Sequence, residues 1–291
     1  MHSPTELTEQ DKCNQATWTT LAARDELDYN EFYTDAGERA AIEHVRDEVR
    51  GKPILDLGVG MGRTIPILKP LTGDYRAIDY MPLMVRICRE RYPDARVEIG
   101  DARDLPGFPS GHFGLVCFSY NGIDAVSAAD RKLVFRAVRR VLAPGGLFLF
   151  SSLNLEGPAY RVRPWHLDLP RRNNSLQYAV SLARAVRWAP VHLANWNRLR
   201  RLSEQGEGYA VAPLSAHHWG IVAHYTTLRR QLEELEREGF GRDVEVFDNK
   251  QGARLRLGDD TSHFDWFQIV ARRGTALGFS EAITSSSRVD G

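Results

Sequence analysis

The 291-residue chain is poor in cysteine, with only Cys13, Cys88 and Cys117 and no Cys-x-x-Cys pair. Scattered cysteines predict neither a disulfide framework nor a zinc site. We therefore expect reduced thiols, a cytoplasmic protein and no bound metal.

Neither sign of charge is in excess, because 38 basic side chains balance 38 acidic ones. This balance gives no overall electrostatic attraction for nucleic acid or for membranes.

Long apolar runs are also missing. No stretch approaches the ~18 to 20 apolar residues that a membrane helix requires. The polar, acidic residues 1–12 lack the basic start and apolar stretch of a secretory signal. No G-x-x-x-x-G-K-[ST] phosphate loop is present either. With 43% hydrophobic residues, the chain can still bury a substantial core, which favours an enzyme-sized globular unit.

The most informative segment is residues 54–64, Ile-Leu-Asp-Leu-Gly-Val-Gly-Met-Gly-Arg-Thr. It predicts a strand that ends in Gly58, Gly60 and Gly62 and runs into a helix. Glycines let the backbone turn tightly and approach a ligand, and the following helix N-terminus offers unpaired N–H groups. The spacing differs from the G-x-G-x-x-G dinucleotide fingerprint. The turn predicts a ligand that carries adenosine.

The Asp-x-Gly-x-Gly-x-Gly order, which begins at Asp56, resembles motif I of the class I, seven-β-strand methyltransferases that use S-adenosylmethionine (SAM). Further landmarks follow in the order of that family. A strand over 75–79 ends in Asp79, and a strand over 97–100 precedes Asp101. An apolar strand over 113–120, a helix over 131–142 and a Pro-Gly-Gly turn at 144–146 lead to a strand over 147–151. The resemblance covers roughly residues 38 to 153 and the closing strands near the C-terminus.

The resemblance implies a doubly wound α/β fold, with a mostly parallel seven-stranded sheet, helices on both faces and SAM as cofactor. Asp79 would accept hydrogen bonds from the ribose hydroxyls, and Asp101 from the adenine amine. Asp56 would either orient the glycine turn or contact the ligand. The residues expected to bind the cofactor are Asp56, Gly58, Gly60, Gly62, Asp79, Tyr80, Met81, Asp101, Ala102, Ser119 and Asn121.

Five parts are predicted along the chain. They are an N-terminal helical appendage (1–50), the SAM-binding core (51–153), a helical cap that selects the substrate (154–222), a helix and two strands that complete the core (223–273), and a mobile tail (274–291). Two helices are expected within the cap, over 175–188 and 191–203.

The cap has an unusual charge balance. Between residues 157 and 201 it carries nine arginines against one acid, interleaved with aromatic residues. These arginines could grip an anionic metabolite or RNA. Alternatively, they lie on a solvated face whose aromatic residues pack on the core.

Methyl transfer requires a deprotonated nucleophile held in line with the methyl carbon and shielded from water. His217 and His218 are candidate bases because histidine titrates near neutral pH. His224 belongs to the same group of candidates, His166 is a weaker one, and a dedicated base is optional. Tyr120, like Tyr33, could present its ring to the sulfonium cation. We take His217, His218 and Tyr120 as the predicted catalytic residues.

The favoured function is SAM-dependent N- or O-methylation of a small metabolite that is either anionic or aromatic. In enzymes that methylate nucleobase amines, the residues after the fourth strand resemble Asn/Asp-Pro-Pro-Tyr/Phe. This chain has Ser-Tyr-Asn-Gly there, at 119–122. Nucleic acid is therefore not the expected partner. Methylation of RNA or protein, and SAM chemistry without methyl transfer in a lyase or cyclase, remain the alternatives.

Overall fold

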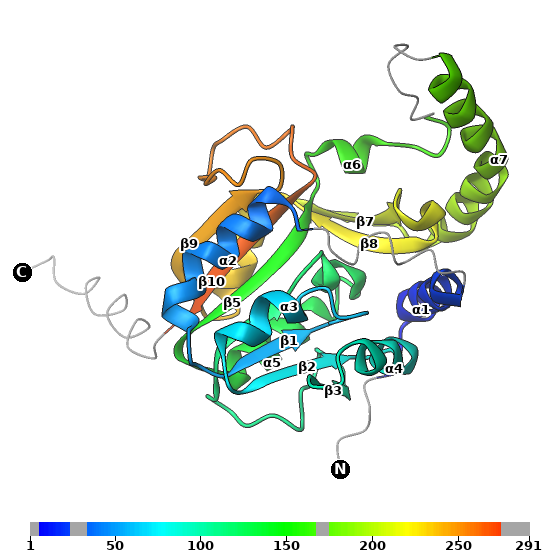
Figure 1. Cartoon of the computed structure of the whole chain (residues 1–291). Coiled ribbons are helices and arrows are strands. Elements are labelled where there is room, and N and C mark those ends of the chain that lie inside the picture. The colour runs from blue at the N-terminus through cyan, green and yellow to red at the C-terminus, as the bar shows by residue number, and fades with distance from the viewer. Residues whose placement is uncertain (1–5, 24–33, 167–174, 275–291) are drawn as a thin grey trace, which may run out of the picture.

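The computed structural model describes residues 6–23, 34–166 and 175–274 (Figure 1). The strands are β1 (Ile54–Leu57), β2 (Tyr75–Asp79), β3 (Arg96–Ile99), β4 (Phe113–Phe118), β5 (Leu142–Asn154), β6 (Glu204–Gly206), β7 (Tyr209–Leu214), β8 (Ile221–Thr226), β9 (Phe240–Asp248) and β10 (Trp266–Arg273). The α-helices are α1 (Glu9–Ala23), α2 (Ala36–Val49), α3 (Ile65–Leu68), α4 (Pro82–Arg91), α5 (Arg131–Val141), α6 (Pro158–Arg161), α7 (Ser175–Leu199) and α8 (Leu228–Arg237). The short 3₁₀ helices are η2 (Lys69–Leu71), η3 (Gly122–Ala125), η4 (Arg200–Leu202) and η5 (His217–Trp219).

Seven strands form the central sheet in the order β3-β2-β1-β4-β5-β10-β9. Neighbours among β1 to β5 pair in parallel, whereas β10 runs antiparallel to both β5 and β9. The predicted doubly wound, mostly parallel α/β fold is therefore confirmed.

Each face of the sheet carries its own apolar core, because successive side chains of a strand point to opposite faces. Leu55 and Leu57 pack on one face with α5 and α8, where Phe135 is fully buried. Ile54 packs on the other face with α2, α3 and α4. Strands covered on both sides must be apolar throughout, which explains the near-continuous hydrophobic runs.

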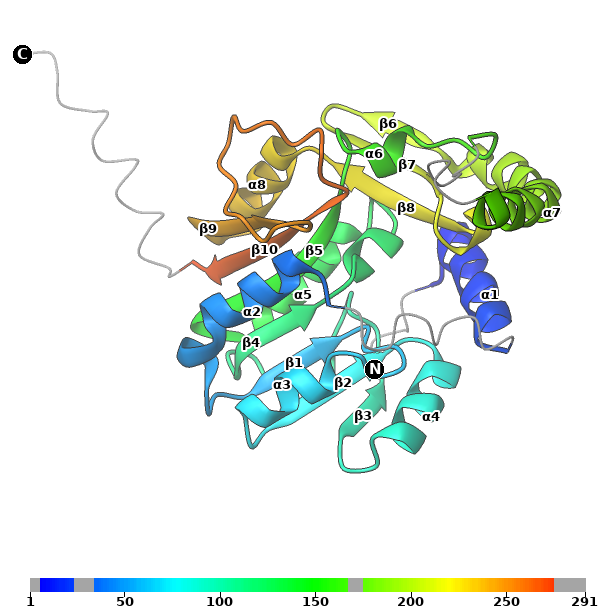
Figure 2. The same ribbon diagram turned by 45° about the horizontal axis from the view of Figure 1, so that its top comes forward.

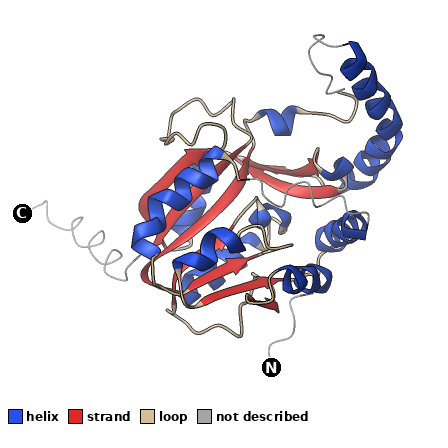
Figure 3. Cartoon of the chain, in the orientation of Figure 1, coloured by secondary structure: helices blue, strands red, loops and turns tan. Residues whose placement is uncertain are grey.

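The segment between β5 and α8 adds three strands to the sheet as well as helix α7 (Figure 3). β8 pairs in parallel with the end of β5, and β7 and β6 follow by antiparallel pairing. The predicted cap is therefore part strand, not wholly helical.

α7 is one helix where the sequence predicts two separated by Pro190. An internal proline removes a helical hydrogen bond, but tertiary contacts hold this helix on both sides of it. Trp188 and His192 both stack on His218 of η5. These contacts explain why the predicted break is wrong.

Both N-terminal helices pack on the rest of the molecule. α2 buries Ala41, Ile42, Val45 and Val49 in the core beneath β9 and β10. α1 docks by polar contacts: the Asn14 amide donates to the Val222 carbonyl and accepts from its N–H, both at 2.9 Å. Among the described residues, no helix is both long and apolar enough to cross a membrane.

Candidate active site

A pocket opens at the carboxyl ends of β1, β2, β3 and β4. α1 lies on the same side of the molecule (Figure 2). Nine of the residues predicted for the site line this pocket: Gly58, Gly60, Asp79, Tyr80, Met81, Asp101, Ala102, Tyr120 and His217. Five lie outside its lining: Asp56, Gly62, Ser119, Asn121 and His218.

Asp79 is tied to the glycine turn. The Gly60 N–H donates to its Oδ2 and the Met81 N–H to its Oδ1, each at 2.9 Å. Burial raises the pKa of the Asp79 carboxyl to about 6, and the two backbone donors lower it only partly. A carboxylate oxygen can accept a second hydrogen bond, so both oxygens keep capacity for a ligand.

The glycine turn needs glycine for two different reasons. Gly58, Gly60 and Gly62 all have positive φ, where a side chain is strained. A Cβ on Gly58 would meet the Phe118 ring at 2.7 Å, and one on Gly62 the Tyr92 ring at 2.4 Å. A Cβ on Gly60 would meet nothing within 4 Å and would extend into the pocket. Gly60 therefore leaves open space for a ligand, whereas Gly62 permits packing behind the turn.

Asp56 lies beneath the turn. Its Oδ2 accepts hydrogen bonds from the Thr64 hydroxyl and, at 2.7 Å, from the Tyr75 hydroxyl. The side chain is fully buried, which raises its pKa to about 6. Of the two predicted roles, these contacts favour orientation of the turn over contact with the ligand.

Asp101 is paired with a buried arginine that the sequence prediction missed. Arg103 Nη2 lies 2.6 Å from Asp101 Oδ2, and Arg103 Nη1 contacts Asp11 of α1 and Asp130 at 2.9 and 3.0 Å. Three carboxylates thus surround one guanidinium, joining α1 to the end of β3. Asp101 keeps 30% side-chain exposure and faces the pocket.

Of the three residues predicted in the turn after β4, one lines the pocket and two lie outside it. Tyr120 lines the pocket, with Arg63 Cζ 5.2 Å from its ring centroid. Ser119 lies behind it and hydrogen-bonds Glu38, which forms a buried ion pair with Arg63 at 2.7 Å. Asn121 takes a left-handed conformation, and its N–H donates to Ser151 at 2.6 Å. Ser119 and Asn121 therefore support Tyr120 from outside the pocket.

The two adjacent histidines point in different directions. His217 lines the pocket, and burial lowers its pKa to about 4. His218 stacks on Trp188 of α7 with ring centroids 4.1 Å apart, away from the pocket. His217, His218 and Trp219 all have positive φ. Such strain persists only where surrounding contacts hold it, and it often marks functional loops.

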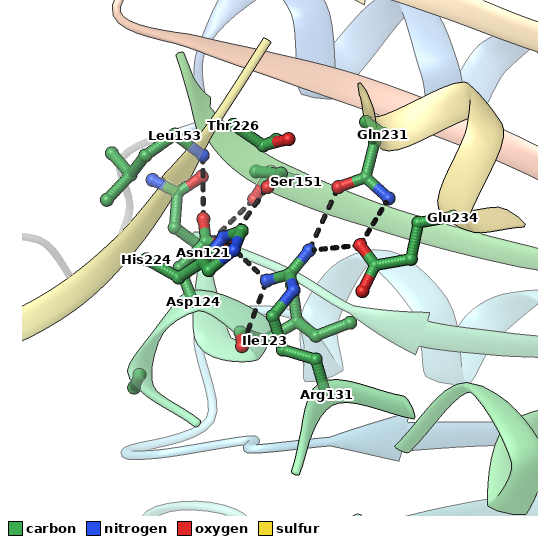
Figure 4. Close-up of polar contacts among 12 residues, drawn as sticks. Asn121, Ile123, Asp124, Arg131, Ser151, Leu153, His224, Thr226, Gln231 and Glu234 are labelled. Carbon is green, nitrogen blue, oxygen red and sulfur yellow. Dashed lines mark hydrogen bonds and ion pairs between the residues drawn. The ribbon is translucent and has the colours of Figure 1, made fainter. Parts of the chain in front are cut away.

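η3 is held by a buried charged network (Figure 4). Asp124 accepts from Arg131 Nη1 at 2.6 Å and from the Leu153 N–H at 2.6 Å. Arg131 also donates to Gln231 and Glu234 of α8. The network fixes the backbone that supplies Gly122, Ala125 and Val126 to the pocket wall.

The remaining candidates lie away from the pocket lining. His224 is buried beside Asp124, and desolvation holds its pKa far below the usual range. His166 is exposed and accepts from the Arg163 N–H. Tyr33 lies outside the described residues, as do Arg171 and Arg172. None of the cap's described arginines lines the pocket.

Sequence reasoning missed several lining residues: Asp11, Trp18, Met61, Arg63, Met84, Arg91, Arg103, Phe118 and Val126. Asp11 and Trp18 come from α1, far away in the sequence, and no local motif marks them. Arg63 and Arg103 each stand one or two residues beyond a predicted site residue. Their position is the signal that could have found them.

Residues 54–146 match a family model described as a methyltransferase domain. A ubiquinone biosynthesis O-methyltransferase from Xanthomonas oryzae pv. oryzae is 25% identical over 193 residues, which is 58% of this chain and 79% of that protein. Two solved structures share the fold. A SAM-dependent methyltransferase from Mesorhizobium loti is 22% identical (TM-score 0.51) and aligns over 82% of this chain and 98% of its own. The 1,6-didemethyltoxoflavin-N1-methyltransferase from Burkholderia thailandensis, solved with bound 1,6-didemethyltoxoflavin and S-adenosylhomocysteine, is 12% identical (TM-score 0.56) and aligns over 94% of both chains.

Proposed function

Because residues 54–146 match the model of a methyltransferase domain, we propose that the protein is a class I SAM-dependent methyltransferase that methylates an oxygen or nitrogen of a small aromatic acceptor. One observation carries this proposal. The pocket that contains Asp79 and Asp101 is also lined by Trp18, Tyr120 and the neutral His217. One cavity therefore has charged groups suited to a nucleoside and aromatic groups suited to a planar acceptor.

The lining residues fit the cofactor. In this proposal Asp79 accepts from the ribose hydroxyls, Asp101 accepts from the adenine amine, and the open space beside Gly60 receives the methionine portion. Tyr80, Met81 and Ala102 line the same cavity. When bound, SAM supplies the methyl group and leaves as S-adenosylhomocysteine.

His217 would accept the proton of the acceptor. Its low pKa keeps the imidazole neutral at physiological pH, so a ring nitrogen can take a proton from a hydroxyl group as the new bond to carbon forms, or from an ammonium group before its nitrogen attacks. The proton then passes to solvent. Tyr120 and Trp18 would orient the acceptor ring and exclude water, which also supports transfer by proximity.

A small acceptor is better supported than RNA. The described arginines of the cap lie outside the pocket lining, so they supply no phosphate contact within the cavity that holds Asp79 and His217. The name of the Xanthomonas relative describes O-methylation in ubiquinone biosynthesis, which also supports a small aromatic acceptor.

The proposal is tested with methyl-labelled SAM and a panel of small phenols, catechols and aromatic amines. We expect label in a small product, formation of S-adenosylhomocysteine, and loss of both in Asp79→Ala. Label only in added RNA or protein would contradict the acceptor class. Methylthioadenosine formed from SAM alone would instead indicate chemistry without methyl transfer.

A further inference from the structure

The turn between β7 and β8 has a strained backbone. His217, His218 and Trp219 have φ angles of 53°, 56° and 62°, in the left-handed region that residues with a side chain rarely adopt. Three such residues in a row persist only where the surrounding structure holds them. The contacts that hold this turn therefore also set the direction of the His217 ring, which lines the pocket.

Helix α7 holds the turn itself. The His218 ring stacks on Trp188 with ring centroids 4.1 Å apart, and the Asn195 side-chain amide donates to the His218 carbonyl at 2.9 Å. The next residue, Trp219, is buried and packs edge-on against Trp196 at 5.0 Å. Both residues that follow His217 are thus fastened to one helix of the cap.

Helix α1 holds the residue that follows the turn. The Thr17 hydroxyl donates to the Gly220 carbonyl at 2.6 Å, and the Gly220 N–H donates to the His217 carbonyl at 2.9 Å. A Cβ on Gly220 would meet the methyl carbon of Thr17 at 2.7 Å, so the helix and the chain approach closely there. Figures 1 and 2 both place α1 and α7 near the same end of β8.

We propose that α7 and α1 together position His217 for proton transfer, with Asn195 and Thr17 as positioning residues. This inference rests on the proposed role of His217 as the proton acceptor. Asn195 and Thr17 lie outside the pocket lining, so each acts through the backbone of the turn. His218 is the anchor of the turn, because its contacts with α7 leave the neighbouring ring to face the pocket.

Both contacts can be removed without undocking either helix. After loss of the Thr17 hydroxyl, α1 is still held by the paired hydrogen bonds between Asn14 and Val222. After loss of the Asn195 amide, α7 still has the stack of Trp188 on His218. The effect on the turn can therefore be measured in a folded chain.

Two matched pairs of variants test the positioning role. Thr17→Val removes the hydroxyl that reaches Gly220, whereas Thr20→Val removes one that bonds within its own helix. Asn195→Ala removes the amide that reaches the turn, whereas Asn197→Ala alters an exposed residue of the same helix. We expect Thr17→Val and Asn195→Ala each to lower kcat by roughly 10 to 100-fold, because a small misplacement of the base is costly. Both controls should keep the wild-type kcat.

Two further measurements separate positioning from a general weakening of the fold. In the His217→Ala background, neither Thr17→Val nor Asn195→Ala should lower kcat further, because no ring remains to be misplaced. In nuclear magnetic resonance of ring-labelled histidine, the wild-type His217 should stay largely neutral between about pH 5 and 8. In the double variant Thr17→Val, Asn195→Ala, the ring reaches water, so its pKa should rise from about 4 toward 6.5.

Circular dichroism and S-adenosylhomocysteine affinity establish that each variant is folded. A folded double variant with wild-type kcat, or with an unchanged His217 titration, would overturn the proposal. So would equal losses of kcat with and without the His217 ring. If His217→Ala itself keeps the wild-type kcat, the proposed base is wrong, a result distinct from an unchanged titration in the double variant.

Discussion

Replacing Asp79 with alanine should weaken the affinity of the protein for its cofactor. The carboxylate would accept two hydrogen bonds from ribose hydroxyls, and a hydrogen bond to a charged group contributes about 1.5 to 3 kcal/mol. Losing both gives about 3 to 6 kcal/mol, or roughly a 10² to 10⁴-fold weaker affinity. Isothermal titration with S-adenosylhomocysteine measures this change.

The same substitution should change how the stability of the ligand-free protein depends on pH. Burial raises the pKa of Asp79 from 3.8 to about 6, so its ionised form costs the fold about 3 kcal/mol. Because the folded pKa is raised, the stability that protonated Asp79 contributes is lost as pH rises through about 6. The melting temperature of Asp79→Ala relative to the wild type should therefore rise over that range.

Asp74→Ala is the matched control, because Asp74 precedes the strand that Asp79 ends and lies at the opposite edge of the sheet. It pairs with Arg76 and His112 on a partly exposed surface. Affinity should be unchanged in this variant. Equal affinity in Asp79→Ala and the wild type would refute our placement of the ribose.

Three further substitutions test other parts of the site. Gly60→Val should abolish detectable S-adenosylhomocysteine binding in calorimetry, because the side chain would extend into the pocket at positive φ. Gly73→Val, at a position with open space and no positive φ, should bind normally. Normal binding by Gly60→Val would contradict the proposed contact between the ligand and the glycine turn. His217→Ala should lower kcat by roughly 10² to 10⁴-fold without changing cofactor affinity. At saturating SAM, the wild-type rate should show no acid limb from His217 until pH approaches about 4, and a limb near pH 6.5 that His217→Ala removes would argue against its burial. In urea unfolding, Arg131→Ala should lower the free energy of unfolding by about 3 to 5 kcal/mol, because it leaves Asp124 buried without a counter-charge. Replacing the exposed Arg136 with alanine should change it by less than about 1 kcal/mol. Equal losses in the two variants would mean that the buried ion pair is not needed for stability.

The sequence predicted the sheet well because its signals are local. The bounds expected for β1 and β2 agree with the structure, since an apolar run closed by Gly58 or Asp79 depends only on neighbouring residues. The strands of the cap were missed although β6, β7 and β8 pair in order along the chain, because they join the sheet only through the pairing of β8 with the distant β5. Such pairing leaves little trace in periodicity.

The site was predicted in part for the same reason. The motif marks Asp79 and Asp101, but it cannot show that Arg103 bridges Asp101 to Asp11 of a distant helix. His217 and His218 are adjacent residues of the same type, so the sequence cannot tell which of them faces the pocket. Only the fold separates them, because α7 supplies the aromatic stack that draws His218 away from the pocket.

A crystal structure of the full chain with S-adenosylhomocysteine tests the central claim most directly. We expect the adenosine at the carboxyl ends of β1 to β4, with both ribose hydroxyls within hydrogen-bond distance of Asp79 and the sulfur on the side of Tyr120 and His217. Adenosine bound elsewhere, or ribose hydroxyls without contact to Asp79, would contradict the account.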